Sequence, residues 1–223
     1  MTRLPLSRRR SAIATFALLI AGFGVATFAA SKKEQRSPDG KFAAVHVSEE
    51  DGSENRAGHI SLIELPSRRV IAPRFMIDVG VAEQLWWSPD SKRFAIYGRP
   101  GTRIGATAVY QRKGDEFIEI DLPEIDKLWE EKYENAIALR TAKLGWAESR
   151  ATRRIEDSIK PLRWLSADAL VLELRYTNIY LKEGTDVTKR FNVRCEAVLT
   201  FSDGDEPVKI RSWRPIKVSM TEP

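Results

Sequence analysis

Two histidines, His46 and His59, are the residues whose type and spacing in this sequence could do chemistry. They flank a stretch with four acidic residues, Glu49, Glu50, Asp51 and Glu54. If that stretch is the loop of a symmetric hairpin, His46 lies directly opposite His59 on one face of the two strands. Two imidazoles and a carboxylate could then hold a divalent metal ion. The competing interpretation places both histidines at the mouth of a solvated loop, and we therefore assign no catalytic, cofactor-binding or metal-binding residue.

Tryptophans interleaved with arginines form a second candidate, a surface on which a sugar or a peptide could bind. These residues are Trp86, Trp87, Trp164, Trp213, Arg163, Arg211 and Arg214. The adjacent Trp86 and Trp87 must point to opposite sides of a strand, so one of them faces outward or into a neighbouring sheet. Large aromatic residues in a small β-domain are mainly core residues. Trp129 and Trp146 are expected to seat helices on a sheet.

Motifs for nucleophilic catalysis, zinc hydrolysis and phosphate binding are absent from the sequence. It contains no G-x-S-x-G, no H-E-x-x-H, no Walker loop, and no G-x-G-x-x-G after a strand. The single cysteine, Cys195, excludes an internal disulfide and a metal site built from several cysteines. It lies in an apolar alternation, which is typical of a small buried side chain. We expect no cofactor and no catalysis.

The charge of the chain argues against nucleic acid as a partner. The formal net charge is +5, but four of the basic residues are arginines within residues 1–10. Without them, 32 basic residues face 31 acidic ones. A nearly neutral domain with interspersed signs lacks the field that follows a phosphate backbone.

Two copies of a short motif organise the rest of the chain. They read SPDGKFAAV at residues 37–45 and WSPDSKRFAI at residues 87–96, and each predicts a tight turn that enters a β-strand. Pro pre-sets φ, Asp bonds its own backbone, and Gly40 can take the left-handed conformation that closes the turn. Ser91 occupies the glycine position of the second copy, at a strain of ~1 kcal/mol.

Degenerate copies of this motif follow at Ser166-Ala167-Asp168 and, as a fourth candidate, at residues 201–204. Between the second and third copies the apolar period changes from 2 to 3.6, which predicts a helical insertion at about residues 123–160. Its second, more polar helical part runs from about residue 147. Without the insertion, the spacing of the copies is close to one four-stranded blade. The helices are expected to cover an exposed sheet edge.

The two good motifs resemble the WD40-like repeats of the TolB-type bacterial propellers. Those proteins are largely exported and use Ser-Pro-Asp-Gly-Lys turns between blade strands. The resemblance implies a mainly β, antiparallel fold with two to three propeller-like blades. The blades need not close into a ring, because a ring takes at least four of them. The alternative architecture is a β-sandwich with a helical cap.

Residues 1–30 have the pattern of a segment that directs export. Residues 12–30 carry no charge and follow the arginines. A basic start, an apolar run and small residues are typical of a signal peptide, with cleavage after Ala26 or Ala29. The run is also just long enough to cross a bilayer, which takes ~20 apolar residues. We favour a cleaved signal, with an uncleaved membrane anchor as the alternative.

Residues 31–223 are therefore expected to form a single β-rich domain in the periplasm or on the extracytoplasmic face of the membrane. This domain would meet the membrane only through residues 11–30. The expected function is non-catalytic binding or scaffolding of a protein or cell-envelope ligand. The alternative is an exported hydrolase, metal-assisted at His46 and His59. An enzyme presents a concave pocket with convergent ionisable groups, whereas a module presents an aromatic or strand-edge surface.

Overall fold

The computed structural model describes residues 34–48, 58–75, 81–101, 103–202 and 208–222. The expected export segment and the acidic stretch between the two histidines lie outside the described residues. Within the described part of the chain, no helix combines the length and the apolar character that a membrane span requires.

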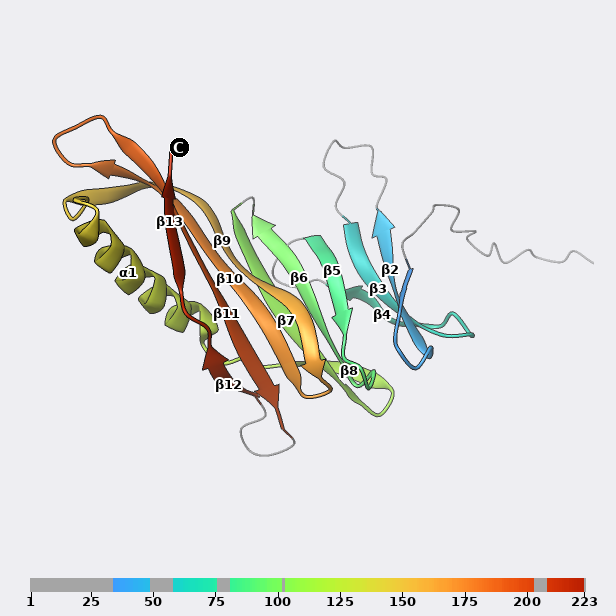
Figure 1. Cartoon of the computed structure of the whole chain (residues 1–223). Helices are drawn as coiled ribbons and strands as arrows, with labels where there is room; N and C mark the ends of the chain where they lie inside the picture. Colours follow the sequence, from blue (N-terminus) through green and yellow to red (C-terminus); the bar gives the residue numbers. More distant parts are fainter. Residues whose placement is uncertain (1–33, 49–57, 76–80, 102, 203–207, 223) are drawn as a thin grey trace, which may run out of the picture. The chain divides into compact units, whose positions relative to one another are not determined.

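The first sheet is a four-stranded antiparallel meander in the order β1-β2-β3-β4 (Figure 1). Its strands are β1 (Glu34–Arg36), β2 (Phe42–Ser48), β3 (Gly58–Glu64) and β4 (Val70–Phe75). Alternate residues such as Phe42, Ala44, Ile60 and Leu62 are buried and belong to one core cluster. This period-2 burial is what an antiparallel sheet with one covered face requires.

The second sheet joins two further meanders into nine strands. The first of these meanders comprises β5 (Val81–Trp87), β6 (Arg93–Gly101), β7 (Ile104–Lys113) and β8 (Glu116–Ile120). The other comprises β9 (Ser149–Ser166), β10 (Ala169–Lys182), β11 (Thr188–Phe201) and β12 (Val208–Trp213), and β13 (Lys217–Thr221) also pairs with β11. A short parallel pairing links them, with Ile104 opposite Asp157 and Gly105 opposite Ser158. The prediction of a mainly antiparallel β fold with two to three blade-like units is confirmed, and the described residues form three meanders.

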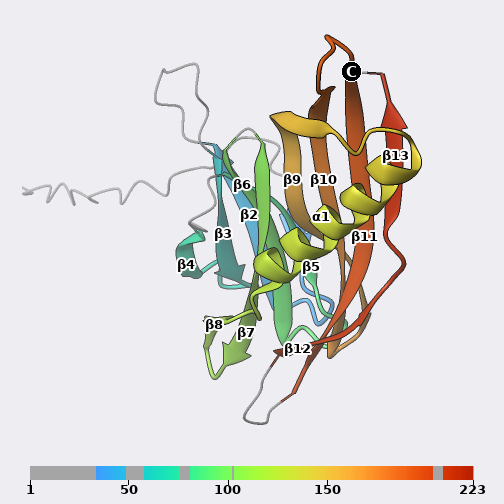
Figure 2. The ribbon, with the colours of Figure 1, turned by 90° about the vertical axis from the view of Figure 1, so that its left-hand side faces the viewer.

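Helix α1 (Ile125–Lys143) lies across the face of β10 and β11 (Figure 2). Four residues spaced four apart along one side of the helix are buried: Ile125, Trp129, Tyr133 and Ile137. They share a core cluster with alternate residues of the two strands, Leu170, Leu172, Leu174, Val193, Cys195 and Leu199. The expectation that helices cover a sheet edge is therefore wrong, because the apolar stripe of α1 is buried against a sheet face.

The second half of the expected helical insertion is a β-strand. Residues 149–160 form the first part of β9, which pairs along its length with β10. Arg, Glu and Ala favour helix here only weakly, and the long antiparallel ladder overrides that preference. The register of β9 shifts beside Pro161, between its partners Val171 and Leu172. Such an irregularity is where a strand tolerates proline.

Three copies of the turn motif occupy the same place in the three meanders. The turns at Ser37, Ser88 and Ser166 each connect the first strand of a meander to its second strand. The fourth candidate differs, because Phe201 and Ser202 end the third strand of the last meander. The fourth copy is therefore not a repeat of the same unit.

The first two turns have the same hydrogen bonds. Ser37 Oγ accepts a hydrogen bond from the Phe42 N–H (3.0 Å) and donates to Asp39 Oδ1 (2.6 Å). The equivalent bonds in the second turn measure 2.9 and 2.7 Å. Gly40 and Ser91 both have positive φ, +69° and +60°, as expected from the motif. The Ser91 hydroxyl also accepts a hydrogen bond from the Asp39 N–H (2.9 Å), so it ties the first turn to the second.

Indole groups connect the meanders to one another. Trp87 Nε1 donates to the Gln35 carbonyl in β1 (3.3 Å), and Trp164 Nε1 donates to the Trp86 carbonyl in β5 (3.0 Å). In both cases a tryptophan at the end of a first strand reaches the first strand of the preceding meander. These bonds fasten successive units at the same end, where the turns lie.

Candidate functional site

The backbone register does not pair the two histidine positions. His46 is paired with Ile60, one position away from His59. Directly opposed residues share a face and successive residues alternate, so positions 46 and 59 belong to opposite faces of the sheet. The observed register keeps Ala44 opposite Leu62 in the core, and that hydrophobic match decides the pairing. Among the described residues, no three His, Cys, Asp or Glu side chains lie close enough together to hold a metal ion.

The tryptophans and arginines do not gather on one surface. The Trp87 ring packs edge-on against Phe94 (5.1 Å between centroids) in the core between the sheets. Trp164 and Trp213 are partly buried against the core beneath α1. The Trp86 side chain is turned away from that of Trp87, as the side chains of adjacent strand residues must be. Lys160 Nζ lies 5.9 Å from the centroid of the Trp86 ring. The hypothesis of an aromatic binding surface is therefore not supported.

Three sequence-based expectations about the core are confirmed. Trp129 and Trp146 are 1% and 7% exposed, and both contribute to the cluster that seats α1 on the sheet. Cys195 is buried and carries a free thiol. Burial raises the pKa of this thiol, which is typical of an inert core cysteine.

Convergent ionisable groups instead occur in a pocket beneath the first half of α1. The pocket has a volume of about 220 Å³ and lies between α1 and the parallel junction of β7 and β9. Its charged residues are three acids and one base, Asp126, Glu130, Asp157 and Arg154. Trp129, Tyr133, Ile159 and residues 104–106 complete the lining. We call this hollow the acidic pocket.

Helix α1 supplies four of these side chains through its periodicity. Asp126 and Glu130 are four residues apart, as are Trp129 and Tyr133, so all four lie along one side of the first two turns. The helix buries its aromatic residues against the sheet and brings the two carboxylates to the margin of the buried stripe. The spacing of the aromatic residues was visible in the sequence, but nothing in the sequence indicated that the two acids line a pocket.

A bulge in β9 supplies the other two charges. Residues three apart in a regular strand, such as Arg154 and Asp157, point to opposite faces. Here the pairing with β10 skips Ile155, between the pairs made by Arg154 and Glu156. The extra residue returns Arg154 to the face of Asp157, and the two side chains form an ion pair with an N–O distance of 3.5 Å. Nothing in the sequence marks this bulge.

The environment of the pocket favours the protonated form of Asp126 and Asp157. Burial, with smaller contributions from Asp126 and Glu130, raises the pKa of Asp157 to about 6, although Arg154 acts in the opposite direction. Burial likewise raises the pKa of Asp126. It also raises the pKa of Tyr133, so the phenol stays protonated. A carboxyl group that titrates close to neutral pH is unusual and often belongs to a functional site.

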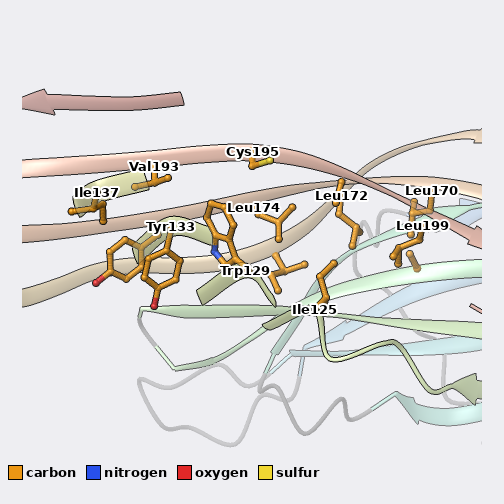
Figure 3. Packing of buried hydrophobic residues seen from close by; sticks show 14 of the residues in the cluster. Ile125, Trp129, Tyr133, Ile137, Leu170, Leu172, Leu174, Val193, Cys195 and Leu199 are labelled. Atoms are coloured by element: carbon orange, nitrogen blue, oxygen red, sulfur yellow. The ribbon is translucent and has the colours of Figure 1, made fainter. Parts of the chain in front are cut away.

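One buried donor in the pocket wall has no partner. The indole Nε1 of Trp129 is buried and makes no hydrogen bond within the described residues. This nitrogen lies on the side of the ring that is turned toward Tyr133 (Figure 3). Leaving such a donor unsatisfied costs ~1–3 kcal/mol, and most buried donors in proteins are paired. An unpaired N–H in the pocket wall is therefore an unusual feature.

A second hollow, of about 440 Å³, lies near the other end of α1. Glu134 is the only acid in its lining, and no basic residue lines it. It therefore lacks the convergent charges of the acidic pocket.

Comparison with known proteins gives little beyond this geometry. No protein-family model and no curated protein matches the chain. Among solved structures, it is similar to the crystal structure of TolB from Acinetobacter baumannii, with 11% sequence identity and a TM-score of 0.34. The match covers 86% of this chain and 46% of that chain, so this chain spans about half the length of its structural neighbour. A likeness this weak carries no argument, and the functional reasoning below depends on the site.

Proposed function

We propose that this protein is an exported, non-catalytic binding module whose acidic pocket receives a cationic group of a protein ligand. The observation that carries the proposal is the lining of one pocket by three carboxylates and one guanidinium. With all groups ionised, the pocket holds two uncompensated negative charges. An entering cation lowers the free energy of these charges, and burial has raised the cost of ionising Asp126 and Asp157.

The unpaired indole N–H of Trp129 narrows the chemistry of the ligand. A group that satisfies the whole pocket offers a positive charge to the carboxylates and an acceptor oxygen to this donor. The N-terminus of a peptide has both, since its ammonium is followed by a carbonyl. Capture of terminal amines is a known mode of peptide recognition. The volume of about 220 Å³ suits one terminal residue, being smaller than the ~300–1,000 Å³ of typical small-molecule sites.

A titration followed by NMR tests the proposal. The probes are glycinamide, which carries an ammonium next to a carbonyl, n-butylammonium, which carries the charge alone, and N-acetylglycinamide, which is neutral. The reporter is the indole N–H resonance of Trp129, assigned with the Trp129→Phe variant. We expect glycinamide to shift this resonance at the lowest concentration and N-acetylglycinamide to leave it unchanged. An equal response to all three probes would contradict the proposal.

Variants locate the binding site. Asp157→Asn and Glu130→Gln each remove one charge and should weaken glycinamide binding by about tenfold, because hydrogen bonds to charged groups contribute ~1.5–3 kcal/mol. Glu131→Gln is the matched control, since Glu131 is exposed on α1 and does not line the pocket. Binding should also be tighter at pH 7.5 than at pH 5, where Asp157 is largely protonated. Equal affinities of the variants and the control would place the ligand elsewhere.

A hydrolase is the second candidate function, and the pKa of Asp157 is the observation that favours it. A carboxyl with a pKa of about 6 is well matched to general acid–base catalysis near neutral pH. The test is turnover of p-nitrophenyl esters and glycosides by the wild type and by Asp157→Asn. Turnover that the substitution abolishes would establish catalysis. Turnover that both proteins share, or that neither shows, would leave binding as the function.

The exported location is a separate part of the proposal and depends on residues 1–30. Cell fractionation followed by N-terminal sequencing of the product tests it. A cleaved signal predicts a mature chain that begins at Thr27 or Ala30, whereas an anchor predicts an intact chain in the membrane fraction. Recovery of the intact protein in the cytosol would contradict export.

A further inference from the structure

A row of cations crosses the face of the second sheet that is turned away from α1. Lys217 in β13 is opposite Arg194 in β11, which in turn is opposite Arg175 in β10. Their chain neighbours Leu174 and Cys195 are buried beneath α1, so the cations belong to the other face. The side chains of Arg175 and Arg194 are 45% and 54% exposed, and Lys217 is also exposed.

This row is electrostatically unfavourable for the protein alone. Opposed side chains on neighbouring strands lie ~5 Å apart, and like charges in that arrangement destabilise a sheet. One carboxylate offsets part of the repulsion, since the buried Glu173 forms ion pairs with both Arg175 (2.7 Å) and Arg194. The three side chains still carry one net positive charge, and Lys217 adds a second. Packing of the core does not require charge at these exposed positions, so the row points to an anionic partner.

The remainder of this face continues the positive charge. By the register of the strands, it carries nine basic residues, Arg150, Arg153, Lys160, Arg163, Arg175, Arg190, Arg194, Lys209 and Lys217. Its acids are Glu156, Glu173 and Glu196. We call this surface the basic face. A domain that is nearly neutral outside its first 30 residues thus concentrates positive charge on one side of one sheet.

We propose that the basic face binds the phosphate headgroups of an anionic lipid bilayer. Exposed cations of this face, Arg163, Arg175, Arg194 and Lys217, lie across the adjacent strands β9, β10, β11 and β13, and none of its nine basic residues lines either hollow described above. Cations spread in this way suit a broad charged surface better than a small enclosed ligand. A protein partner would meet an apolar centre with few charges at a specific interface, and the row places charges at the centre instead. Arginine, the commonest of the nine, binds phosphate with two parallel hydrogen bonds.

This inference is independent of the acidic pocket and enlarges the membrane contact expected for residues 11–30. Flotation of the full chain with vesicles tests it. One set of vesicles contains phosphatidylcholine alone, and the other contains equal parts of phosphatidylcholine and phosphatidylglycerol. Any insertion of residues 11–30 contributes to binding by both sets of vesicles. The readout is therefore the partition coefficient for the anionic vesicles divided by that for the neutral ones. We expect a ratio well above one that falls as salt is raised.

Single substitutions then assign the preference to the basic face. Lys217→Gln and Arg194→Gln should each lower the ratio roughly fivefold, and the double variant should lower it by about the product. Lys217→Gln leaves both ion pairs of Glu173 in place, so it remains informative if Arg194→Gln unfolds. Arg140→Gln is the matched control, because Arg140 is an exposed cation in the last turn of α1.

Three outcomes would overturn the proposal. The first is a ratio of one for the wild type. The second is an equal loss of preference in Arg140→Gln, which would show that net charge alone is responsible. The third is binding to poly-glutamate that these substitutions weaken while vesicle binding is unchanged, which would make the partner an acidic protein.

Discussion

Replacing Asp157 by asparagine should stabilise the protein at neutral pH while removing a charge that we assign to ligand binding. The pKa of Asp157 in the folded protein, about 6, lies above the usual value of 3.8. Above pH 6 the side chain is ionised in both the folded and unfolded states, and the folded state bears the cost of burying the charge. Well below pH 3.8 it is protonated in both states and that cost disappears. Asparagine resembles the neutral form at every pH.

The magnitude follows from the size of the shift. A shift of about two pKa units corresponds to at most ~3 kcal/mol. The side chain of Asp157 is 22% exposed, and solvent screening lowers the cost of burying its charge. We therefore expect a difference of ~1.5 kcal/mol in the free energy of unfolding. The opposing attraction of Arg154 is already contained in the net shift. At pH 7.5, Asp157→Asn should therefore melt ~3–6 °C above the wild type, since 1 kcal/mol moves the midpoint by ~2–4 °C in a chain of this size.

Urea unfolding at about pH 2.5, well below the unfolded pKa of 3.8, and at pH 7.5 measures the effect. The free energy of unfolding of the variant should exceed that of the wild type by ~1.5 kcal/mol at pH 7.5 and equal it at the lower pH. Asp186→Asn, which alters an exposed carboxylate in the turn after β10, serves as the control and should show no such pH dependence. A variant that is destabilised at pH 7.5, or that differs equally at both pH values, would refute the assignment of the raised pKa to burial.

Two further predictions concern backbone positions. Ser91→Ala keeps the positive φ but loses the hydroxyl that accepts a hydrogen bond from Asp39, so urea unfolding should show a loss of ~1 kcal/mol. Ser91→Gly also loses this bond but relieves ~1 kcal/mol of backbone strain, so it should be nearly neutral, and equal stability of the two variants would contradict this reasoning. Gly105→Ala makes a Cβ overlap with the hydroxyl oxygen and the adjoining ring edge of Tyr97 and should cost ~2–3 kcal/mol. A thermal melt unchanged from that of the wild type would show that this contact is loose.

The turns and the helix were predictable because their interactions are local. In the first turn, Ser37 bonds residues no more than five positions away, and the motif contains all of those partners. The stripe of α1 likewise repeats within one continuous segment, and Gly145, with a φ of +71°, follows its last turn as expected. The copies of the motif predicted two to three blade-like units, and the described residues form three meanders. These features depend on the order of residues along a short piece of chain.

Contacts between residues far apart in the sequence determined the features that could not be predicted. The first part of β9 has a helix-compatible composition, but fourteen residues of β10 pair with the strand and hold it extended. The same pairing includes the bulge that brings Arg154 beside Asp157. The register between β2 and β3 separated His46 from His59. The row on the basic face likewise exists only because three strands align.

By itself, the sequence thus determined the turns, the helix and the β class, since hydrogen bonds and apolar periods over a few residues encode them. The tertiary structure decided register, bulges and the merging of two meanders into one sheet. A shift of one residue in a strand costs little locally, yet it exchanges the two faces, and only the packing of the whole sheet selects between them.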